Sequence, residues 1–366
     1  MKNRNDYQYL LKVYRETKKD ESNFIETQSV HWEKYNKEYK KFDNIENLIN
    51  FRKDQVLSAG LDDAINLKNK INLLETLEEF DENFLKNSLP DKNIGNCQHS
   101  KNFLGYWFDN GIMHSLKYFQ NIEKYIQNNF LVLEIGGGFG SLARVILSNR
   151  DVKYFLIDLP EANLMSNYYL QSHFPQKKIF NYLVYKKNKF TDCIEDYDVF
   201  ILPPRILENE NIKYDFIINT RSFMEMNKKT INDYFSFIQN KINVNGYFLN
   251  VNRYLKSSVN EKIKFEEYPY DKLWNVIISN KGFLQSNIHF LLTRRTDSEG
   301  NIKDELSRIK NSNLKWKSES YLKFRVIRHR LKRFTWLIIK PILTFLVGRK
   351  RLKEISRVLY NISEND

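Results

Sequence analysis

The chain has 366 residues, 42% of them hydrophobic and 14% aromatic, which suffices for one large domain or two smaller ones with a packed core. Its two cysteines, Cys97 and Cys193, lie far apart, which excludes a disulfide framework and fits a reducing compartment. Residues 1–23 are polar, so we expect no signal peptide, and no apolar stretch reaches the ~18 residues of a membrane span. These features predict a cytoplasmic protein.

The net charge of +13 is concentrated in a tail, because residues 303–366 contain 17 Lys and Arg against 6 Asp and Glu. No recognised nucleic-acid-binding module accompanies this charge, so we expect no nucleic-acid partner. The apolar run from Trp336 to Val347 contains Lys340 and Pro341 and is too short and broken to cross a bilayer. Two interpretations remain open: peripheral association with an anionic membrane at the inner face of the cell, or a basic helix packed on the body.

The first part of the chain reads as helical. Residues 1–88 lack proline and repeat apolar side chains at helical spacing among charges, and Pro90 and Gly95 then mark a break. An aromatic-rich stretch over 103–126 predicts two further helices. We therefore divide the chain into a helical N-terminal region (1–90), an α/β domain (91–300) and a basic, amphipathic and helical C-terminal tail (301–366).

From residue 130 onward, strands alternate with helices, which predicts an α/β fold with a doubly wound, mostly parallel sheet. The expected strands cover 130–134, 153–158, 198–202, 214–219 and 247–252, and residues 283–294 supply the last one or two. The expected helices cover 141–149, 161–173, 228–242 and 271–280. Ligands of such sheets bind at the carboxyl ends of the strands, where the strand order reverses.

A glycine cluster follows the first of these strands. The strand ends at Glu134, and the cluster consists of Gly136, Gly137, Gly138 and Gly140. Glycines let the backbone turn tightly and let a ligand approach where a Cβ would collide. About 20 residues later the next strand ends at Asp158, and a carboxylate there can accept both hydroxyls of a ribose. The pattern indicates a nucleoside-containing cofactor.

The glycine spacing distinguishes between cofactors. A dinucleotide fingerprint needs Gly-x-Gly-x-x-Gly, but here Ser141 occupies the last position and Gly140 comes one residue early. Glu134 would repel a diphosphate, whereas it could face the ammonium group of an amino acid. S-adenosylmethionine (SAM) has that ammonium group and a ribose but no phosphate. The arrangement resembles motif I of the Rossmann-like SAM-dependent methyltransferases, and an NAD-dependent oxidoreductase is the alternative.

Three blocks carry a closer resemblance, namely residues 133–140, residues 157–161 and residues 218–226 with the sequence Ile-Asn-Thr-Arg-Ser-Phe-Met-Glu-Met. Together with Asn93-Ile94-Gly95-Asn96, they resemble the bacterial sugar O-methyltransferase family, whose members occur in surface-polysaccharide gene clusters. The resemblance covers about residues 90–295 and excludes the tail. It implies methylation of a sugar or glycan hydroxyl in capsule or lipopolysaccharide biosynthesis. The alternatives are methylation of a phenolic or other small molecule, and a catalytically silent membrane-bound scaffold for glycan assembly.

These patterns assign roles to individual residues. The expected SAM-binding residues are Glu134, Gly136, Gly137, Gly138, Gly140, Asp158, Leu159, Asn219 and Thr220. A sugar hydroxyl is a poor nucleophile and needs a general base or a metal. Glu225 is the first candidate base, although a helix N-terminus also favours a carboxylate there, and His99 and His114 are the others. No His or Cys cluster has zinc-ligand spacing, whereas a magnesium site built from scattered carboxylates stays open.

Overall fold

The computed structural model describes residues 4–21, 44–53, 80–97, 100–103, 105–209, 211–256, 261–314 and 317. The chain divides into two compact units, residues 1–311 and residues 312–366. The first unit includes helix α11 (Ile302–Asn311), which the sequence analysis had assigned to the tail. Most of the basic tail lies outside the described residues. Among those that are described, no helix is both long and apolar enough to cross a membrane.

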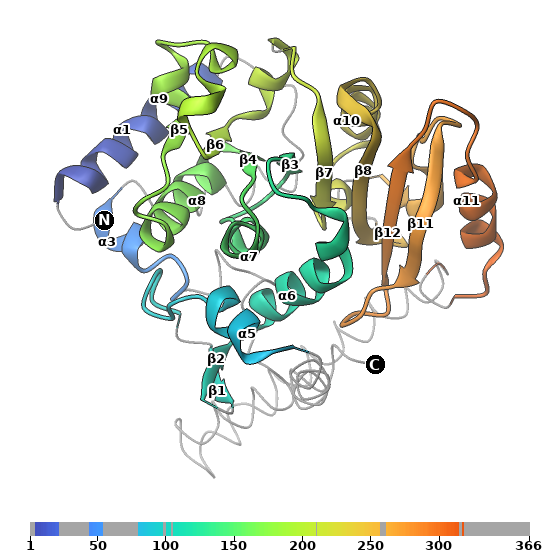
Figure 1. Ribbon diagram of the computed structural model, residues 1–366, viewed down its shortest axis with the longest axis horizontal. Helices are drawn as coiled ribbons and strands as arrows, with labels where there is room; N and C mark the ends of the chain where they lie inside the picture. Colours follow the sequence, from blue (N-terminus) through green and yellow to red (C-terminus); the bar gives the residue numbers. More distant parts are fainter. Residues whose placement is uncertain are drawn as a thin grey trace, which may run out of the picture. The chain divides into compact units, whose positions relative to one another are not determined.

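The first unit is built on an eight-stranded sheet with the order β11-β12-β8-β7-β3-β4-β6-β5 (Figure 1). The strands β5, β6, β4, β3, β7 and β8 run parallel, β12 runs antiparallel to β8, and β11 runs antiparallel to β12. The order and direction confirm the predicted α/β class. The bounds are Leu131–Ile135 (β3), Lys153–Ile157 (β4), Ile179–Asn181 (β5), Val199–Leu202 (β6), Tyr214–Thr220 (β7), Ile242–Arg253 (β8), Trp274–Lys281 (β11) and Ile288–Arg295 (β12).

Helices cover the sheet. Figure 1 shows α1 beside α8 and α9 at one end of the sheet and α11 beside β11 at the other, while α5 and α6 pack against α7. Two small hairpins, β1–β2 and β9–β10, lie outside the main sheet. The bounds are Arg4–Glu21 (α1), Ile45–Ile49 (α3), Glu82–Ser88 (α5), Lys101–Phe103 (β1), Tyr106–Phe108 (β2), Asn110–Ile122 (α6), Ser141–Asn149 (α7), Pro160–His173 (α8), Tyr182–Tyr185 (α9), Lys228–Lys241 (α10), Leu255–Lys256 (β9) and Ile263–Lys264 (β10).

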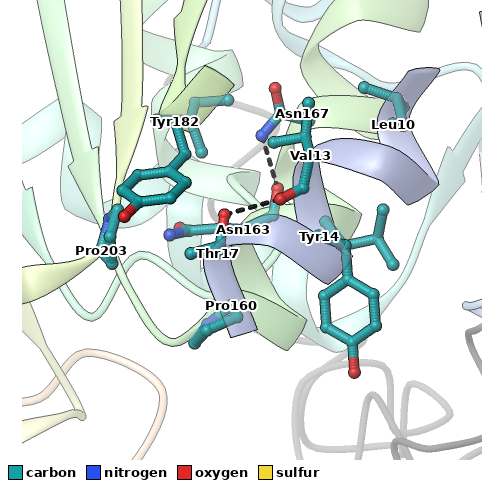
Figure 2. Close-up of a pocket in the computed structure, with 11 residues that line it drawn as sticks. Leu10, Val13, Tyr14, Thr17, Pro160, Asn163, Asn167, Tyr182 and Pro203 are labelled. Atoms are coloured by element: carbon teal, nitrogen blue, oxygen red, sulfur yellow. Dashed lines mark hydrogen bonds between the residues drawn. The ribbon is translucent and has the colours of Figure 1, made fainter. Parts of the chain in front are cut away.

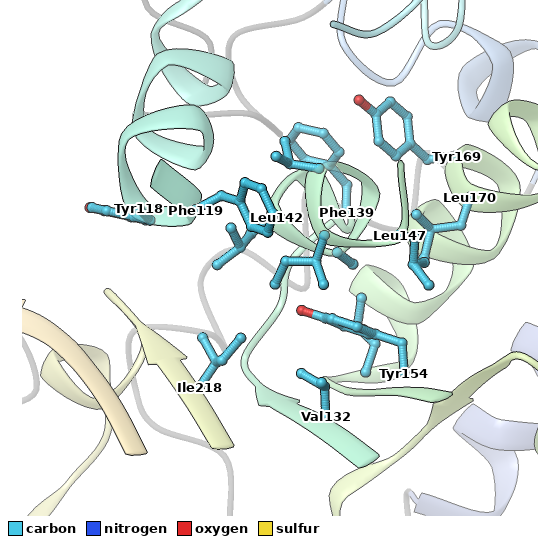
Figure 3. Packing of buried hydrophobic residues seen from close by; sticks show 14 of the residues in the cluster. Tyr118, Phe119, Val132, Phe139, Leu142, Leu147, Tyr154, Tyr169, Leu170 and Ile218 are labelled. Carbon is cyan, nitrogen blue, oxygen red and sulfur yellow. The ribbon is translucent and has the colours of Figure 1, made fainter. Parts of the chain in front are cut away.

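The central strands are apolar on both faces because both faces are covered. In β4, Tyr154 and Leu156 join the cluster that packs under α7 and α8, part of which Figure 3 shows. Phe155 between them faces the other side, where its ring stacks on Phe200 with the centroids 4.3 Å apart. A strand buried on both faces has no polar alternation, and this explains the continuous apolar runs in the sequence.

Two predicted helices are wrong. Residues 271–280, predicted as helical, contain β11, whose centre is the β-branched run Val276-Ile277-Ile278 and which pairs with β12 around a register shift. The first part of 103–126 belongs to the β1–β2 hairpin, and only the second part forms the helix α6. Asp109 starts that helix, because its Oδ1 accepts a hydrogen bond from the Ile112 N–H at 2.8 Å.

The N-terminal region is helical in α1, α3 and α5, as predicted for the part described. The turn containing Gly95 packs on the segment after α3, since a Cβ on Gly95 would lie 2.6 Å from Phe51 and 2.7 Å from Arg52. Arg52 and Asp109 form a buried ion pair at 2.5 Å, and the Arg52 guanidinium also lies over the ring of Phe139. This pair links the N-terminal segment to the glycine loop.

Candidate active site

The strand order reverses at β3, which has β4 on one side and β7 on the other. From β3 the chain forms β4, then the edge strand β5, then β6 between them, and it crosses afterwards to β7 and β8 on the other side of β3. The carboxyl ends of β3, β4 and β7 therefore meet where such sheets bind ligands. Glu134 lies near the end of β3, Asp158 directly after β4 and Asn219 near the end of β7.

The glycine loop needs its glycines for two reasons. Gly136, Gly138 and Gly140 have φ values of 75°, 58° and 87°, which side chains with a Cβ rarely adopt. A Cβ on Gly136 would also overlap the side chain of Ser222, so the loop and the segment after β7 touch at this glycine. Gly140 is the N-cap of α7, which begins at Ser141.

Asp158 braces this loop. Its Oδ2 accepts a hydrogen bond from the Gly138 N–H at 2.7 Å, and its Oδ1 accepts one from the Leu159 N–H at 2.7 Å. A carboxylate has about four acceptor sites, so oxygens held in this way can still accept ribose hydroxyls. Burial raises the pKa of Asp158 to about 7, the two backbone bonds oppose the shift, and the carboxylates of Glu225 and Glu161 add to it.

Glu134 is a second carboxyl at the same place. Its side chain is 1% exposed, and its Oε2 accepts a hydrogen bond from the Tyr154 hydroxyl at 2.8 Å. A Cβ on Gly137 would lie 2.9 Å from the same oxygen. Burial raises the pKa of Glu134 to about 7, Tyr154 opposes the shift, and the nearby Asp158 adds to it. Two buried carboxyls that resist ionisation favour a cation as their partner.

Asn219 is fully buried and connects three segments. Its Nδ2 donates to the Ile135 carbonyl at 2.9 Å, and its Oδ1 accepts from the Phe223 N–H at 3.1 Å and from Asn252 Nδ2 at 2.9 Å. Asn252 Oδ1 in turn accepts from the Met224 N–H at 3.2 Å. These bonds fix the short 3-10 helix η7 (Phe223–Glu225) against the ends of β3, β7 and β8. A direct contact of Asn219 or of its neighbour Thr220 with a cofactor stays a prediction.

Glu225, at the end of η7, is half-buried. It lies close enough to Asp158 and to Lys256 to raise the pKa of both. The predicted base therefore lies near the carboxyl end of β4 and near the β9–β10 hairpin. Both lie at the edge of the sheet where β3 ends and the glycine loop begins.

His114, on α6, lies elsewhere at this edge. It is 6% exposed, and its Nε2 has no hydrogen-bond partner among the described residues. It lines a small pocket with Tyr118 and the turn 282–285. Burial, with a contribution from the Arg221 cation, holds the pKa of His114 well below its usual value. His99 lies outside the described residues. Within the described ranges, no group of three His, Cys, Asp or Glu residues is placed to hold a metal ion.

Another pocket lies between α1 and α8. Figure 2 shows Val13 and Thr17 of α1 facing Pro160 and Asn163 of α8 across it. Asn163 Nδ2 donates a hydrogen bond to the backbone carbonyl of Asp158 at 2.8 Å, so helix α8 fixes the backbone of Asp158. The N-terminal helix thus supports the carboxyl end of β4 through α8.

Some residues at this edge were not singled out by the sequence. Ser222 lies within the 218–226 block, but only the structure shows that it takes the space left by the missing Cβ of Gly136. Lys256 is one of many lysines, and nothing in its neighbours distinguishes it. Its partly buried position depends on the β9–β10 hairpin.

Comparisons with solved structures return methyltransferases of several kinds. A methyltransferase from Pyrococcus furiosus aligns with a TM-score of 0.34 and 10% identity over 50% of this chain and 83% of its own. TehB from Haemophilus influenzae gives 0.33 and 16% over 56% and 66%. The tRNA m1G37 methyltransferase of M. jannaschii gives 0.34 and 13% over 54% and 57%. No family model and no curated protein sequence matches the chain.

Proposed function

We propose that the chain is a SAM-dependent O-methyltransferase. The observation that carries the proposal is the pair of carboxyls, Glu134 and Asp158, on either side of a loop with three left-handed glycines. SAM carries an ammonium group for one carboxyl and ribose hydroxyls for the other. A diphosphate would meet two carboxyls here and would be repelled.

The sheet supports SAM over the NAD alternative. Dinucleotide-binding sheets join two parallel βαβαβ halves around the switch point. In this sheet, antiparallel β12 lies next to β8 and β11 lies next to β12, so the second half is not built in that way. The early third glycine, Gly140, agrees, because it forms the N-cap of α7 itself.

In the proposed mechanism, the protein mainly positions its ligands and moves one proton. Bound SAM supplies a methyl group that is already activated for in-line displacement. Asp158 and Glu134 orient the ribose and the ammonium group. Glu225 would accept the proton of the acceptor hydroxyl. The oxygen of that hydroxyl would form the new bond to the methyl carbon as the carbon–sulfur bond breaks. The Asn219–Asn252 network makes this feasible by fixing η7, on which Glu225 lies.

The proposed acceptor is a sugar hydroxyl of a cell-surface polysaccharide. The 218–226 block supports this choice through its resemblance to the sugar O-methyltransferase family, and the block covers the carboxyl end of β7 and η7. A phenolic or other small-molecule acceptor is the closest alternative. Assays with sugar and phenolic acceptors side by side separate the two.

Titration calorimetry of the full chain with SAM tests the cofactor. Gly138→Val should remove binding, because a branched side chain would enter the ligand's path and disfavour φ 58°. Gly105→Val is the matched control, since Gly105 also has a positive φ (86°) but nothing lies within 4 Å of its added Cβ. Undiminished SAM affinity in a folded Gly138→Val protein would overturn the assignment.

For the tail, we propose peripheral association with an anionic membrane surface, supported by its charge and its apolar run. Each basic residue near such a surface contributes about 1 kcal/mol, screened by salt. Because α11 belongs to the first unit, a truncation should follow Asn311. Binding to phosphatidylserine vesicles should weaken with salt and disappear in the truncated chain, while SAM binding persists. A full chain that ignores these vesicles at low salt contradicts the proposal.

A further inference from the structure

Basic side chains gather on the acceptor side of Glu225. Arg221 directly follows β7, Arg253 ends β8, and Lys256 lies in β9. The Arg221 N–H donates to the Val251 carbonyl at 2.7 Å, so the two strand ends are adjacent, about 4.8 Å apart as in any sheet. Arg221 has a left-handed φ of 65°, which places it at a sharp turn over this edge.

These cations are close enough to repel one another. Burial is the largest cause that lowers the pKa of Lys256, which stands at about 8, and the charges of Arg253 and Arg221 lower it further. Glu225 is the carboxylate that opposes the shift. The cations of Arg221 and Lys256 therefore lie near each other in a partly buried place.

Two of these cations have no charged partner among the described residues. Neither the Arg221 guanidinium nor the Lys256 ammonium makes a hydrogen bond or ion pair with any residue that the structure describes. The Arg52–Asp109 pair at 2.5 Å shows how the same chain neutralises a buried cation that serves the fold. Partly buried cations held together without such a partner suit an anionic ligand.

We infer that the acceptor carries an oxyanion, a phosphate or a carboxylate, which Arg221 and Lys256 bind with the charge of Arg253 beside them. The inference rests on the proposed function for the identity of this side as the acceptor site. Glu225 lies close to both Asp158 and Lys256, so a hydroxyl next to the bound oxyanion would lie near the base and near the proposed ribose-binding carboxylate. An arginine fork and a lysine point charge can bind either oxyanion.

The test is calorimetry of the full chain with glucose 1-phosphate, glucuronate and glucose. At least one charged sugar should bind more tightly than glucose, and the phosphate and carboxylate arms show which oxyanion is preferred. Lys256→Met should weaken that binding by about 10- to 100-fold, the range for a hydrogen bond to a charged group. Lys256→Arg should retain most of it, and Lys229→Met, an exposed lysine on α10, should change nothing.

Equal affinity for charged and neutral sugars, or a folded Lys256→Met protein that binds the charged sugar undiminished, overturns the inference. If Lys256→Met does not fold, Arg221→Met is judged by the same criterion. SAM titration on the same samples keeps the two proposals apart. A wild-type chain that does not bind SAM refutes the cofactor proposal, whereas the anion titrations decide this one.

The pH dependence of sulfate binding separates a direct role of Lys256 from a structural one. Sulfate stays a dianion across the range, so its affinity should fall as the pH rises through about 8 and Lys256 loses its proton. Arginine side chains do not titrate in this range, and Lys264 on the neighbouring β10 is paired with Glu267. Lys256→Met should abolish this pH dependence, and a dependence that persists in the variant contradicts the assignment.

Discussion

The two sides of the site carry opposite charge. On the side of β3 and β4, Glu134 and Asp158 are carboxyls whose pKa values burial raises to about 7. On the side of β7, β8 and β9, Arg221 and Lys256 are cations, and burial lowers the pKa of Lys256 to about 8. In both places burial disfavours the charged form of the side chain, and a ligand of opposite charge would favour it. The contrast predicts a cationic cofactor on one side and an anionic acceptor on the other.

The largest expected effect comes from Glu225, at the boundary of the two sides. Glu225→Gln keeps the shape and removes the base, so the methyl-transfer rate should fall by roughly 10²–10⁴. SAM affinity should change little, because Glu225 serves the acceptor. Single-turnover methyl transfer and SAM calorimetry measure the two quantities. Normal turnover would make Glu225 structural, and His114→Gln would then test the next candidate.

The next effect concerns the cofactor side. Asp158→Ala removes a carboxylate that can accept two ribose hydroxyls, each bond to a charged group contributing about 1.5–3 kcal/mol. SAM affinity should fall by roughly 10²-fold or more on this basis. Affinity for the charged sugar should stay near the wild-type value. A variant that loses both ligands equally would show that Asp158 holds the whole edge together.

A smaller effect is expected from the network between the sides. Asn219→Ala would leave the Ile135 carbonyl and the Phe223 N–H without their partner, which costs about 1–3 kcal/mol of unfolding free energy. Because η7 is no longer fixed, the methyl-transfer rate should also fall, by less than in Glu225→Gln. Denaturant unfolding and single-turnover assays measure both, with exposed Asn188→Ala as the control. Unchanged stability and rate would remove Asn219 from the account.

The smallest expected effect is the pH dependence of the cofactor side. Glu134 and Asp158 must ionise to bind SAM, so affinity should rise with pH and level off above about 7. Below that pH the change is roughly tenfold per pH unit for each ionisation that binding requires. Glu134→Gln should make the curve shallower. SAM affinity that is independent of pH between 6 and 8 contradicts this assignment.

The same pKa shifts determine whether the free energy of unfolding of the protein without SAM rises or falls with pH. The folded pKa values of both acids exceed their ordinary values, so their favourable contribution is complete below about pH 4 and is lost as the pH rises to about 7. The thermal unfolding temperature of the wild type should therefore fall over this pH range relative to that of Glu134→Gln. A wild type with the same pH profile as the variant would contradict the raised pKa of Glu134.

Much of the cofactor side follows from sequence, because the residues that form it are neighbours in the chain. The strand before Glu134, the glycines, helix α7 and Asp158 were placed within one or two residues, since each depends on local backbone needs. The N-cap role of Gly140 explains why the glycine pattern departs from the dinucleotide fingerprint.

The acceptor side could not be predicted in this way. Residues 271–280 could be read as a helix, because the apolar pattern of a short segment does not distinguish helical from strand periodicity. Pairing with β12 makes the segment a strand. Arg221, Arg253 and Lys256 come together only through β7–β8 pairing and the β9–β10 hairpin. The contact of Ser222 with Gly136 likewise joins segments far apart in sequence.

The division of charge is tested most directly by titrating SAM into the full chain already saturated with the preferred charged sugar, and by the reverse titration. Two sides of opposite charge predict that both ligands bind at once, each with one site and with affinity close to its value alone. Competition between SAM and the charged sugar, or a folded chain that does not bind SAM, would contradict the account.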